Sequence, residues 1–223
     1  KIMAGAYRPD SGKILFQGEE VNFGHPVVAQ AMGISIIYQE FNLLPERTVA
    51  QNIYLGREPA TLGIINSRQL NNQAGDVLRD LGVEQMISPT ALVSTLSVAE
   101  QQLVEIAKAV SLNARVLIMD EPTASLTSTE VNLLKDLIAR LKDKQLAVIF
   151  ISHRLSEVFG IADKITVLKD GVLVGTKNIA EVNTEDVVYM MVGRVLDHYF
   201  PPLGEEEDFG EVVLEVKSGS NDF

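Results

Sequence analysis

The stretch Arg115-Val116-Leu117-Ile118-Met119-Asp120-Glu121-Pro122-Thr123-Ala124-Ser125 decides the fold of this chain. Four apolar residues lead directly into two adjacent carboxylates, Asp120 and Glu121, and Pro122 then stops the strand. A short apolar run bounded in this way predicts a strand buried on both faces of a parallel sheet. Such sheets place ligands at the carboxyl ends of their strands. Successive side chains on a strand point to opposite faces, so we expect different tasks for the two carboxylates, one toward a metal ion and one toward a reacting water.

Taken alone, the carboxylate pair is equally compatible with two solvated side chains at a strand end. The composition narrows the choice of protein class. The chain has 223 residues, 46% of them hydrophobic and 22% charged, which is typical of a globular protein. A net charge of −11 argues against a nucleic-acid-binding face, because phosphate contacts need clustered Lys and Arg. With no cysteine, the chain has neither disulfides nor thiolate metal sites. No run approaches the ~18 apolar residues of a membrane span.

The fold class expected from the pattern is α/β. Strand–helix–strand alternation over residues 116–152 predicts a parallel sheet with helices packed on it. Met32–Tyr38 is an apolar strand ending at Gln39, and Leu146–Ser152 is another buried strand, ending at His153. Polar side chains therefore follow three strands of one predicted sheet.

Two helices open with a Ser/Thr-x-x-Glu capping box. They begin at Ser97-Val98-Ala99-Glu100 and at Thr127-Ser128-Thr129-Glu130. Residues at helical spacing are expected to bury one face of each helix: Leu103, Ile106, Ala107 and Val110 in the first, and Val131, Leu134, Ile138 and Leu141 in the second. Residues 48–95 are expected to form further helical segments joined by loops. Together with the helix that begins at Ser97, they form a helical insertion between two strands of the sheet.

The remaining segments predict a small antiparallel β part. Residues 1–5 resemble the last turn of a helix that ends at Gly5. Short strands at 13–17 and 21–23 form a hairpin-like piece, and strands at 165–168 and 172–174 form a hairpin around Asp170-Gly171.

The expected domain plan has three parts. Residues 1–198 are expected to form one α/β domain with a helical subdomain at about 48–112. Residues 199–210, which include Pro201-Pro202 and four acidic residues, are an acidic linker. Residues 211–223 are the first strand of a second domain, cut off at Phe223.

Several motifs, standing in one order along residues 1–195, resemble the ATP-binding subunits of ABC transporters, which have a P-loop NTPase-like parallel-sheet core. The motifs are Gln39 after its strand, Leu96-Ser97-Val98-Ala99-Glu100-Gln101-Gln102, Leu117-Ile118-Met119-Asp120-Glu121-Pro122, Ser125-Leu126-Thr127 and Ile151-Ser152-His153. The signature departs from the family's usual Leu-Ser-Gly-Gly-Gln. With Glu-Ile-Ala-Lys-Ala at 105–109, it is similar to the N-terminal ATPase half of bacterial monosaccharide importers of the ribose, galactose and xylose type.

The resemblance implies ATP and Mg²⁺ as ligands and hydrolysis as the reaction. It implies that Glu121 is the general base that orients the attacking water. Asp120 would hold Mg²⁺ directly or through water, since a hard cation takes oxygen ligands. Gln39 would help to hold Mg²⁺ and water, and His153 would contact the γ-phosphate and position Glu121. The ordinary alternatives are a surface amide for Gln39 and a structural histidine for His153.

Ser97, at the N-terminus of a helix, is placed to meet an anion. In the family this end, with Val98, Ala99 and Glu100, meets the γ-phosphate bound by the opposite half, and Ser125 belongs to a second nucleotide-facing motif. Loss of both signature glycines limits close backbone approach. Glu100 adds negative charge near phosphate unless the capping box uses it. The alternative for Ser97 is a helix cap without a ligand.

No P-loop of the form Gly-x-x-x-x-Gly-Lys-Ser/Thr stands in the chain. The stretch from Gly5 to Gly12-Lys13-Ile14 has six intervening residues, and Ile14 cannot bind Mg²⁺, so we interpret it as a turn leading into a strand. In the family the P-loop precedes the residue that corresponds to Lys1. We therefore expect this chain to bind ATP weakly or not at all, and a longer protein that contains it to hydrolyse ATP.

The implied partners are a second ATPase half in the same polypeptide or a homodimer, transmembrane permease subunits and, indirectly, a periplasmic sugar-binding protein. The implied location is peripheral, on the cytoplasmic face of the bacterial inner membrane. By resemblance, Phe41–Asn52 receives the permease, although Phe41, Leu43 and Leu44 are equally suited to a core.

One competing hypothesis is a degenerate regulatory half that completes a partner's ATP site without hydrolysis. Another, a DNA-repair ATPase, predicts a long coiled-coil insertion and a basic surface, and the sequence has neither.

Overall fold

The computed structural model describes residues 1–193. They form two compact units, Lys1–Asp163 and a unit that begins at Lys164. The predicted linker at 199–210 and strand at 211–223 lie outside the described residues.

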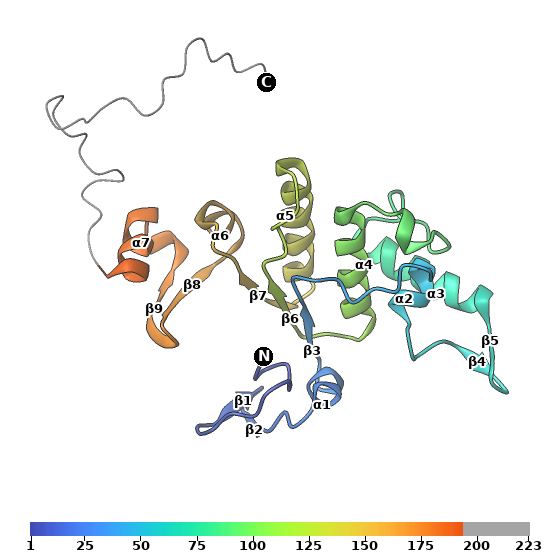
Figure 1. The fold of residues 1–223 in the computed structure, drawn as a ribbon, viewed down its shortest axis with the longest axis horizontal. Coiled ribbons are helices and arrows are strands. Elements are labelled where there is room, and N and C mark those ends of the chain that lie inside the picture. Colours follow the sequence, from blue (N-terminus) through green and yellow to red (C-terminus); the bar gives the residue numbers. More distant parts are fainter. Residues whose placement is uncertain (194–223) are drawn as a thin grey trace, which may run out of the picture. The chain divides into compact units, whose positions relative to one another are not determined.

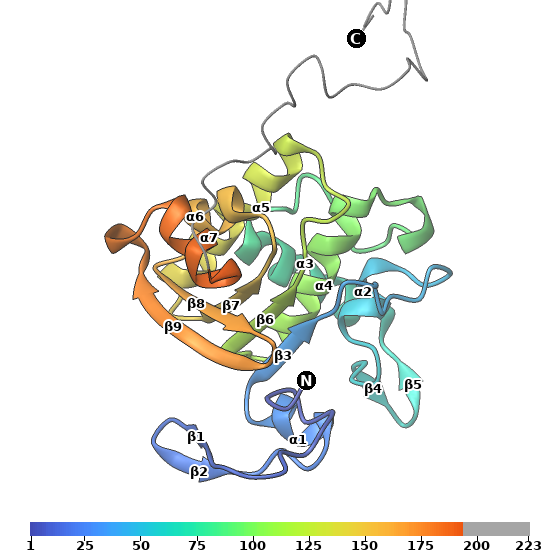
Figure 2. The same ribbon diagram turned by 60° about the vertical axis from the view of Figure 1, so that its left-hand side comes forward.

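A three-stranded parallel sheet forms the centre of the first unit. Its strands are β3 (Ile34–Ile37), β6 (Val116–Asp120) and β7 (Ala147–Ile151), in the order β3-β6-β7 (Figures 1 and 2). Ile37 lies opposite Met119 and Asp120 lies opposite Ile151, so the three strands end at the same edge of the sheet. The predicted parallel sheet is confirmed.

The central strand β6 is buried on both faces, as its apolar run predicts. Leu117 and Met119 are fully buried in the main core. Ile118 faces a smaller cluster with Phe23 and Ile34. The alternation of side chains thus places one helix-covered core on one face of the strand and a second core on the other.

The prediction that β7 is buried is wrong. Its residues alternate between exposed and half-buried, and Ile149 and Ile151 are 37% and 45% exposed. The reason is position: among the described residues β7 pairs with β6 alone, so it is an edge strand of this sheet.

The segment between β3 and β6 is mainly helical. It contains α2 (Val49–Ile53), α3 (Ser67–Leu81), the 3₁₀ turn η1 (Val93–Thr95) and α4 (Val98–Ser111). The expected core face of α4 is confirmed, with Leu103, Ile106 and Ala107 buried and Val110 partly buried. The sequence did not predict the short hairpin of β4 (Ala60–Thr61) and β5 (Ile64–Ile65) in this segment.

The N-terminal residues close a helical turn. Ala6 N–H donates to Lys1 O (3.1 Å) and Gly5 N–H to Ile2 O (2.9 Å), the pair of hydrogen bonds of a Schellman motif. Gly5 has φ +71°, and a Cβ there would lie 2.6 Å from the carbonyl oxygen of His25. Glycine is therefore required at this turn.

A hairpin of β1 (Ile14–Phe16) and β2 (Glu19–Val21) follows, with Gln17 and Gly18 both at positive φ. The predicted hairpin is present, although its second strand begins at Glu19 and not at the predicted Val21. Gly12-Lys13 forms the turn before the first strand, and Lys13 pairs with Glu20. A six-residue helix that the sequence did not predict, α1 (Pro26–Ala31), then leads to β3.

Helix α5 (Ser128–Asp143) begins at the predicted capping box and buries the four predicted residues. Glu130 accepts hydrogen bonds from Thr127 N–H and from the Thr127 hydroxyl, both at 2.8 Å. After β7 comes α6 (Leu155–Ile161), the last helix of this unit.

The capping box of α5 makes stability depend on pH. The backbone N–H of Thr127, followed by its hydroxyl, holds the pKa of Glu130 below its ordinary value. A lowered folded pKa stabilises the fold above the unfolded pKa of about 4.3, and this stabilisation disappears as the pH falls through the folded pKa. Glutamine retains the box without the charge. We expect Glu130→Gln to lower the melting temperature at pH 7, with the difference vanishing once the pH falls below the folded pKa of Glu130. Thermal unfolding across this range measures it, and a pH-independent difference would contradict the explanation.

The second unit begins with the predicted hairpin, made by β8 (Lys164–Lys169) and β9 (Val172–Asn178). Asp170 and Gly171, both at positive φ, form its two-residue loop. The 3₁₀ turn η2 (Ile179–Glu181) and α7 (Thr184–Val192) follow. Within residues 1–193, every helix is too short or too polar to cross a membrane.

Candidate functional site

The predicted catalytic carboxylate lies where β6 turns away from the sheet. Glu121 N–H donates to Ile151 O (2.9 Å), which extends the pairing of β6 and β7 by one bond. Glu121 itself has φ +48°, in the left-handed region that non-glycine residues rarely adopt. Such backbone conformations cluster at functional sites, where surrounding contacts hold them in place.

His153 reaches this carboxylate from the end of β7. Its Nδ1 lies 3.2 Å from Glu121 Oε1, and with the proton on Nδ1 the imidazole donates to the carboxylate. The Glu121 side chain is 33% exposed and that of His153 65% exposed. The two predicted catalytic residues, 32 positions apart in sequence, are therefore in contact at a solvent-accessible strand end.

Gln39 and Asp120 occupy the neighbouring strand ends. Gln39 stands exposed two residues after Ile37, whose partner in β6 is Met119, and Asp120 directly follows Met119. Within residues 1–193, no group of three or more His, Asp or Glu side chains has the arrangement of a metal site. Two oxygen-bearing side chains fit Mg²⁺, because this ion characteristically takes one or two protein ligands and fills its shell with phosphate and water oxygens.

The turn after Glu121 contains residues that the sequence did not point to. Thr123 is 2% exposed, and its hydroxyl donates to Glu157 Oε2 at 2.5 Å. Ser152 also donates to Glu157 Oε2, at 3.2 Å. The predicted Ser125 lies exposed in the same turn, with no hydrogen bond of its side chain among the described residues. The only sequence signal for Glu157 was its position near the start of a helix.

Ser97 caps α4, as the sequence predicts. Its hydroxyl oxygen accepts from Glu100 N–H (3.3 Å), and its own N–H donates to Glu100 Oε2 (2.8 Å). Val98 is exposed and Ala99 buried. The box thus uses the carboxylate of Glu100. No hydrogen bond or ion pair in the described part of the chain joins Ser97–Glu100 to the Glu121–His153 pair.

Two buried polar residues, also missed, hold the loop that follows Gln39. Asn52 is fully buried; its amide donates to Leu44 O and Thr48 O, each at 3.0 Å, and it accepts from Leu44 N–H at 2.7 Å. Glu105 of α4 accepts from Asn42 N–H at 2.8 Å. Within this loop Leu43 packs against the main core and Leu44 is 42% exposed.

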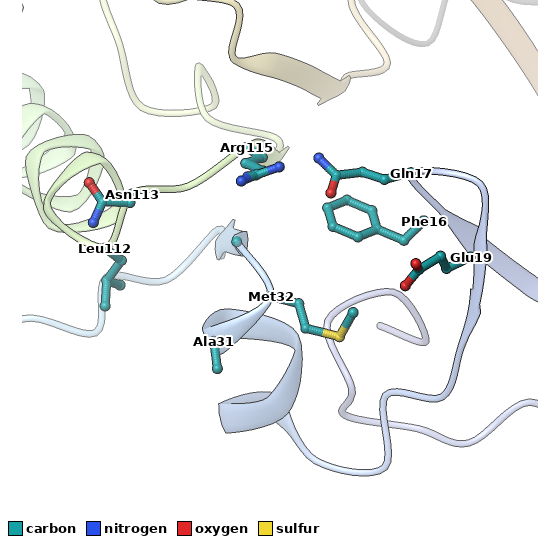
Figure 3. A pocket seen from close by; sticks show the side chains of 9 residues that line it. Phe16, Gln17, Glu19, Ala31, Met32, Leu112, Asn113 and Arg115 are labelled. Carbon is teal, nitrogen blue, oxygen red and sulfur yellow. The ribbon is translucent and has the colours of Figure 1, made fainter.

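A cavity of about 530 Å³ lies at the other end of the sheet. Gly33 and Arg115, which precede β3 and β6, line it, and Arg115 and Gln17 point toward one another across it (Figure 3). Its remaining lining residues are Phe16, Glu19, Ala31, Met32, Leu112 and Asn113. Because it adjoins the amino ends of the strands, this cavity is not part of the Glu121–His153 site.

Comparisons with known proteins found one matching family model and relatives that match most of the chain. The family model described as "ABC transporter" matches residues 1–124. Ribose import ATP-binding protein RbsA 1 of Rubrobacter xylanophilus is 48% identical over 217 residues, 97% of this chain and 42% of that protein. A putative ribose/galactose/methyl galactoside import ATP-binding protein of Burkholderia ambifaria is also 48% identical over 217 residues, 97% of this chain and 41% of that protein. The chain thus spans less than half the length of these relatives.

Solved structures show the same fold. The ADP conformation of MJ1267, an ATP-binding cassette of an ABC transporter, superposes with a TM-score of 0.71 at 23% identity, covering 86% of this chain and 81% of that one. A nucleotide-free ATP-binding cassette gives a TM-score of 0.67 at 22% identity, covering 90% and 81%. At these identities the likeness concerns the fold alone. The predicted α/β fold with the parallel core of an ATP-binding cassette is confirmed.

Proposed function

The chain belongs to the ABC transporter family, and from this membership we propose that it forms part of an ATPase that energises import of a monosaccharide through a membrane transporter. The relatives named as ribose or galactose import ATP-binding proteins support the sugar class. The observation that carries the proposal is the contact between Glu121 and His153 at 3.2 Å, beside Asp120 and the end of β3.

In the proposed reaction, Glu121 orients the attacking water and accepts its proton. The left-handed backbone turns this residue out of the strand, and the bond from its N–H to Ile151 O fixes its main chain. His153 holds the carboxylate in one orientation and presents its other ring nitrogen, Nε2, toward the terminal phosphate. General-base catalysis of this type contributes about 10²–10⁴-fold to a rate.

Asp120 and Gln39 would hold Mg²⁺, which, when bound, neutralises charge that develops on the phosphate oxygens. Ser97 would meet the nucleotide of a second ATPase half: the hydroxyl oxygen caps α4 while its proton is free to be donated to an anion. Ser125 would face the same interface between halves. The partner half is a second domain of the same polypeptide or another copy.

The exposed loop after Gln39 is proposed to receive the permease, which would place the protein on the cytoplasmic face of the membrane. Leu44 supplies exposed apolar surface there, while Asn52 and Glu105 hold the backbone in place.

The alternative of a degenerate regulatory half gains no support from the comparisons. One argument for that alternative was the negative charge that Glu100 would place near the phosphate. This argument is weakened, because the carboxylate of Glu100 is used in the capping box.

The test is ATP binding and Mg²⁺-dependent turnover by this chain and by a protein of the relatives' full length that carries these residues and a Gly-x-x-x-x-Gly-Lys-Ser/Thr loop. We expect the long protein to bind and hydrolyse ATP, and this chain to bind it weakly. If the long protein binds ATP but never hydrolyses it, even with permease present, the assignment of hydrolysis is wrong.

A further inference from the structure

Glutamate stands at the third helical position of α4, α5 and α6, but it is used differently in α6. Glu100 and Glu130 each reach back to the N–H of the residue that caps their own helix. In α6 the capping residue is Arg154, which makes no side-chain cap, and its N–H donates instead to Ser152 Oγ at 3.0 Å. The carboxylate of Glu157 is therefore not used in a capping box and can bond other groups.

The carboxylate of Glu157 joins the two loops of the proposed catalytic site. Oε2 accepts from Thr123 Oγ1 at 2.5 Å and from Ser152 Oγ at 3.2 Å, and Oε1 accepts from Arg154 at 3.3 Å. The first distance is that of a charge-assisted hydrogen bond. Glu157 is 6% exposed, so little water competes for these bonds.

The two hydroxyls lie next to the proposed catalytic residues. Thr123 is two positions after Glu121, and Ser152 directly precedes His153. Both loops follow neighbouring strands, and they are joined by the Glu121–Ile151 backbone bond, the Glu121–His153 contact and the Glu157 bridge. One buried carboxylate thus fixes the distance between the loop with the base and the loop with the histidine.

We propose that Glu157 is a positioning residue for ATP hydrolysis, which holds the Glu121 loop against the His153 loop through Thr123 and Ser152. This inference rests on the proposed function. Glu157 is buried and its oxygens are occupied by protein donors, so it acts through Glu121 and His153. A small misplacement of reacting groups is enough to slow a reaction by up to about 10²-fold.

The test compares Glu157→Gln with Glu130→Gln, the same change at the same helical position of α5. In the full-length transporter ATPase, we expect Glu157→Gln to lower kcat by about 10-fold or more, with the Kd for ATP within about twofold of wild type. Glu130→Gln should leave kcat within about twofold. Thr123→Val should reproduce the loss, and Thr123→Ser, which restores a hydroxyl, should recover most of kcat.

A second readout needs no ATP. The chain has three histidines, so ¹⁵N spectra of their imidazoles are simple, and His153→Gln assigns the His153 signals. Glu121→Gln should shift the His153 Nδ1 signal, because it replaces the charged acceptor. We expect Glu157→Gln and Thr123→Val to move that signal in the same direction, and Glu130→Gln to leave it in place.

The outcomes separate the two proposals. If Glu121→Gln leaves turnover unchanged, the proposed function fails. If Glu121→Gln stops turnover, while Glu157→Gln and Thr123→Val match Glu130→Gln in kcat and in the His153 signal, then Glu157 has no positioning role. Should Glu157→Gln fail to fold, the Thr123 variants decide the matter by the same two readouts.

Discussion

Glu121→Gln is expected to lower ATP turnover by about 10²–10⁴-fold in the full-length protein, with ATP binding unchanged within about twofold. Glutamine fills the same space but accepts no proton from water. A loss in kcat with unchanged binding is what removal of an interaction made only in the transition state produces. Nucleotide binding by fluorescence and phosphate release in the steady state measure the two quantities. Comparable losses in binding and in kcat would argue for a structural role instead.

Glu121→Gly provides a matched comparison, because the backbone at this position has φ +48°. A left-handed conformation costs a residue with a Cβ roughly 1–2 kcal/mol, and glycine avoids this cost. We expect the glycine variant to be as inactive as the glutamine variant and to unfold at an equal or higher temperature. A marked loss of stability would mean that the Glu121 side chain is needed for the fold.

Asn52→Ala is expected to lower the free energy of unfolding by about 3 kcal/mol, or the melting temperature by about 6–12 °C. Asn52 is fully buried, and its side chain hydrogen-bonds four backbone groups: the N–H and C=O of Leu44 and the C=O groups of Arg47 and Thr48. Alanine removes these hydrogen bonds and leaves the N–H of Leu44 without its acceptor, while the carbonyl groups keep backbone donors. Thermal and urea unfolding of wild type and variant measure the difference.

Asn66→Ala is the control for this prediction. Asn66 accepts one hydrogen bond, from Gln69 N–H at 3.0 Å, at the exposed start of α3. Loss of such a cap costs about 1 kcal/mol. Equal losses in the two variants would show that burial and the number of bonds at Asn52 do not determine its contribution.

The sequence predicted the features that are encoded locally. The capping boxes at Ser97 and Thr127 and the apolar run of β6 each need only a few neighbouring residues, and all three are found. The proximity of Glu121 and His153 was also predictable, because parallel strands end at one edge of their sheet. The elements that the sequence did not predict are equally informative.

Helix α1 and the β4–β5 hairpin carry only part of the usual local signals, Pro26 at the first helical position and Gly63 in the turn. His25, which is not among the common capping residues, caps α1, and Leu62 takes the first position of the hairpin turn at φ +52°. The residue before a proline favours an extended backbone, whereas Glu121, which precedes Pro122, takes a left-handed one. Contacts from β7, distant in sequence, hold the left-handed one instead. Glu157 was missed for the same reason, since Thr123 is 34 positions away.

The exposed edge of β7 has a consequence for work with this protein in the test tube. Among the described residues no strand other than β6 pairs with β7, and Ile149 and Ile151 on this edge strand are both partly exposed. An edge with these properties is a template on which a strand from another molecule can add. We therefore expect self-association that rises with protein concentration, and we expect Ile149→Lys to reduce it.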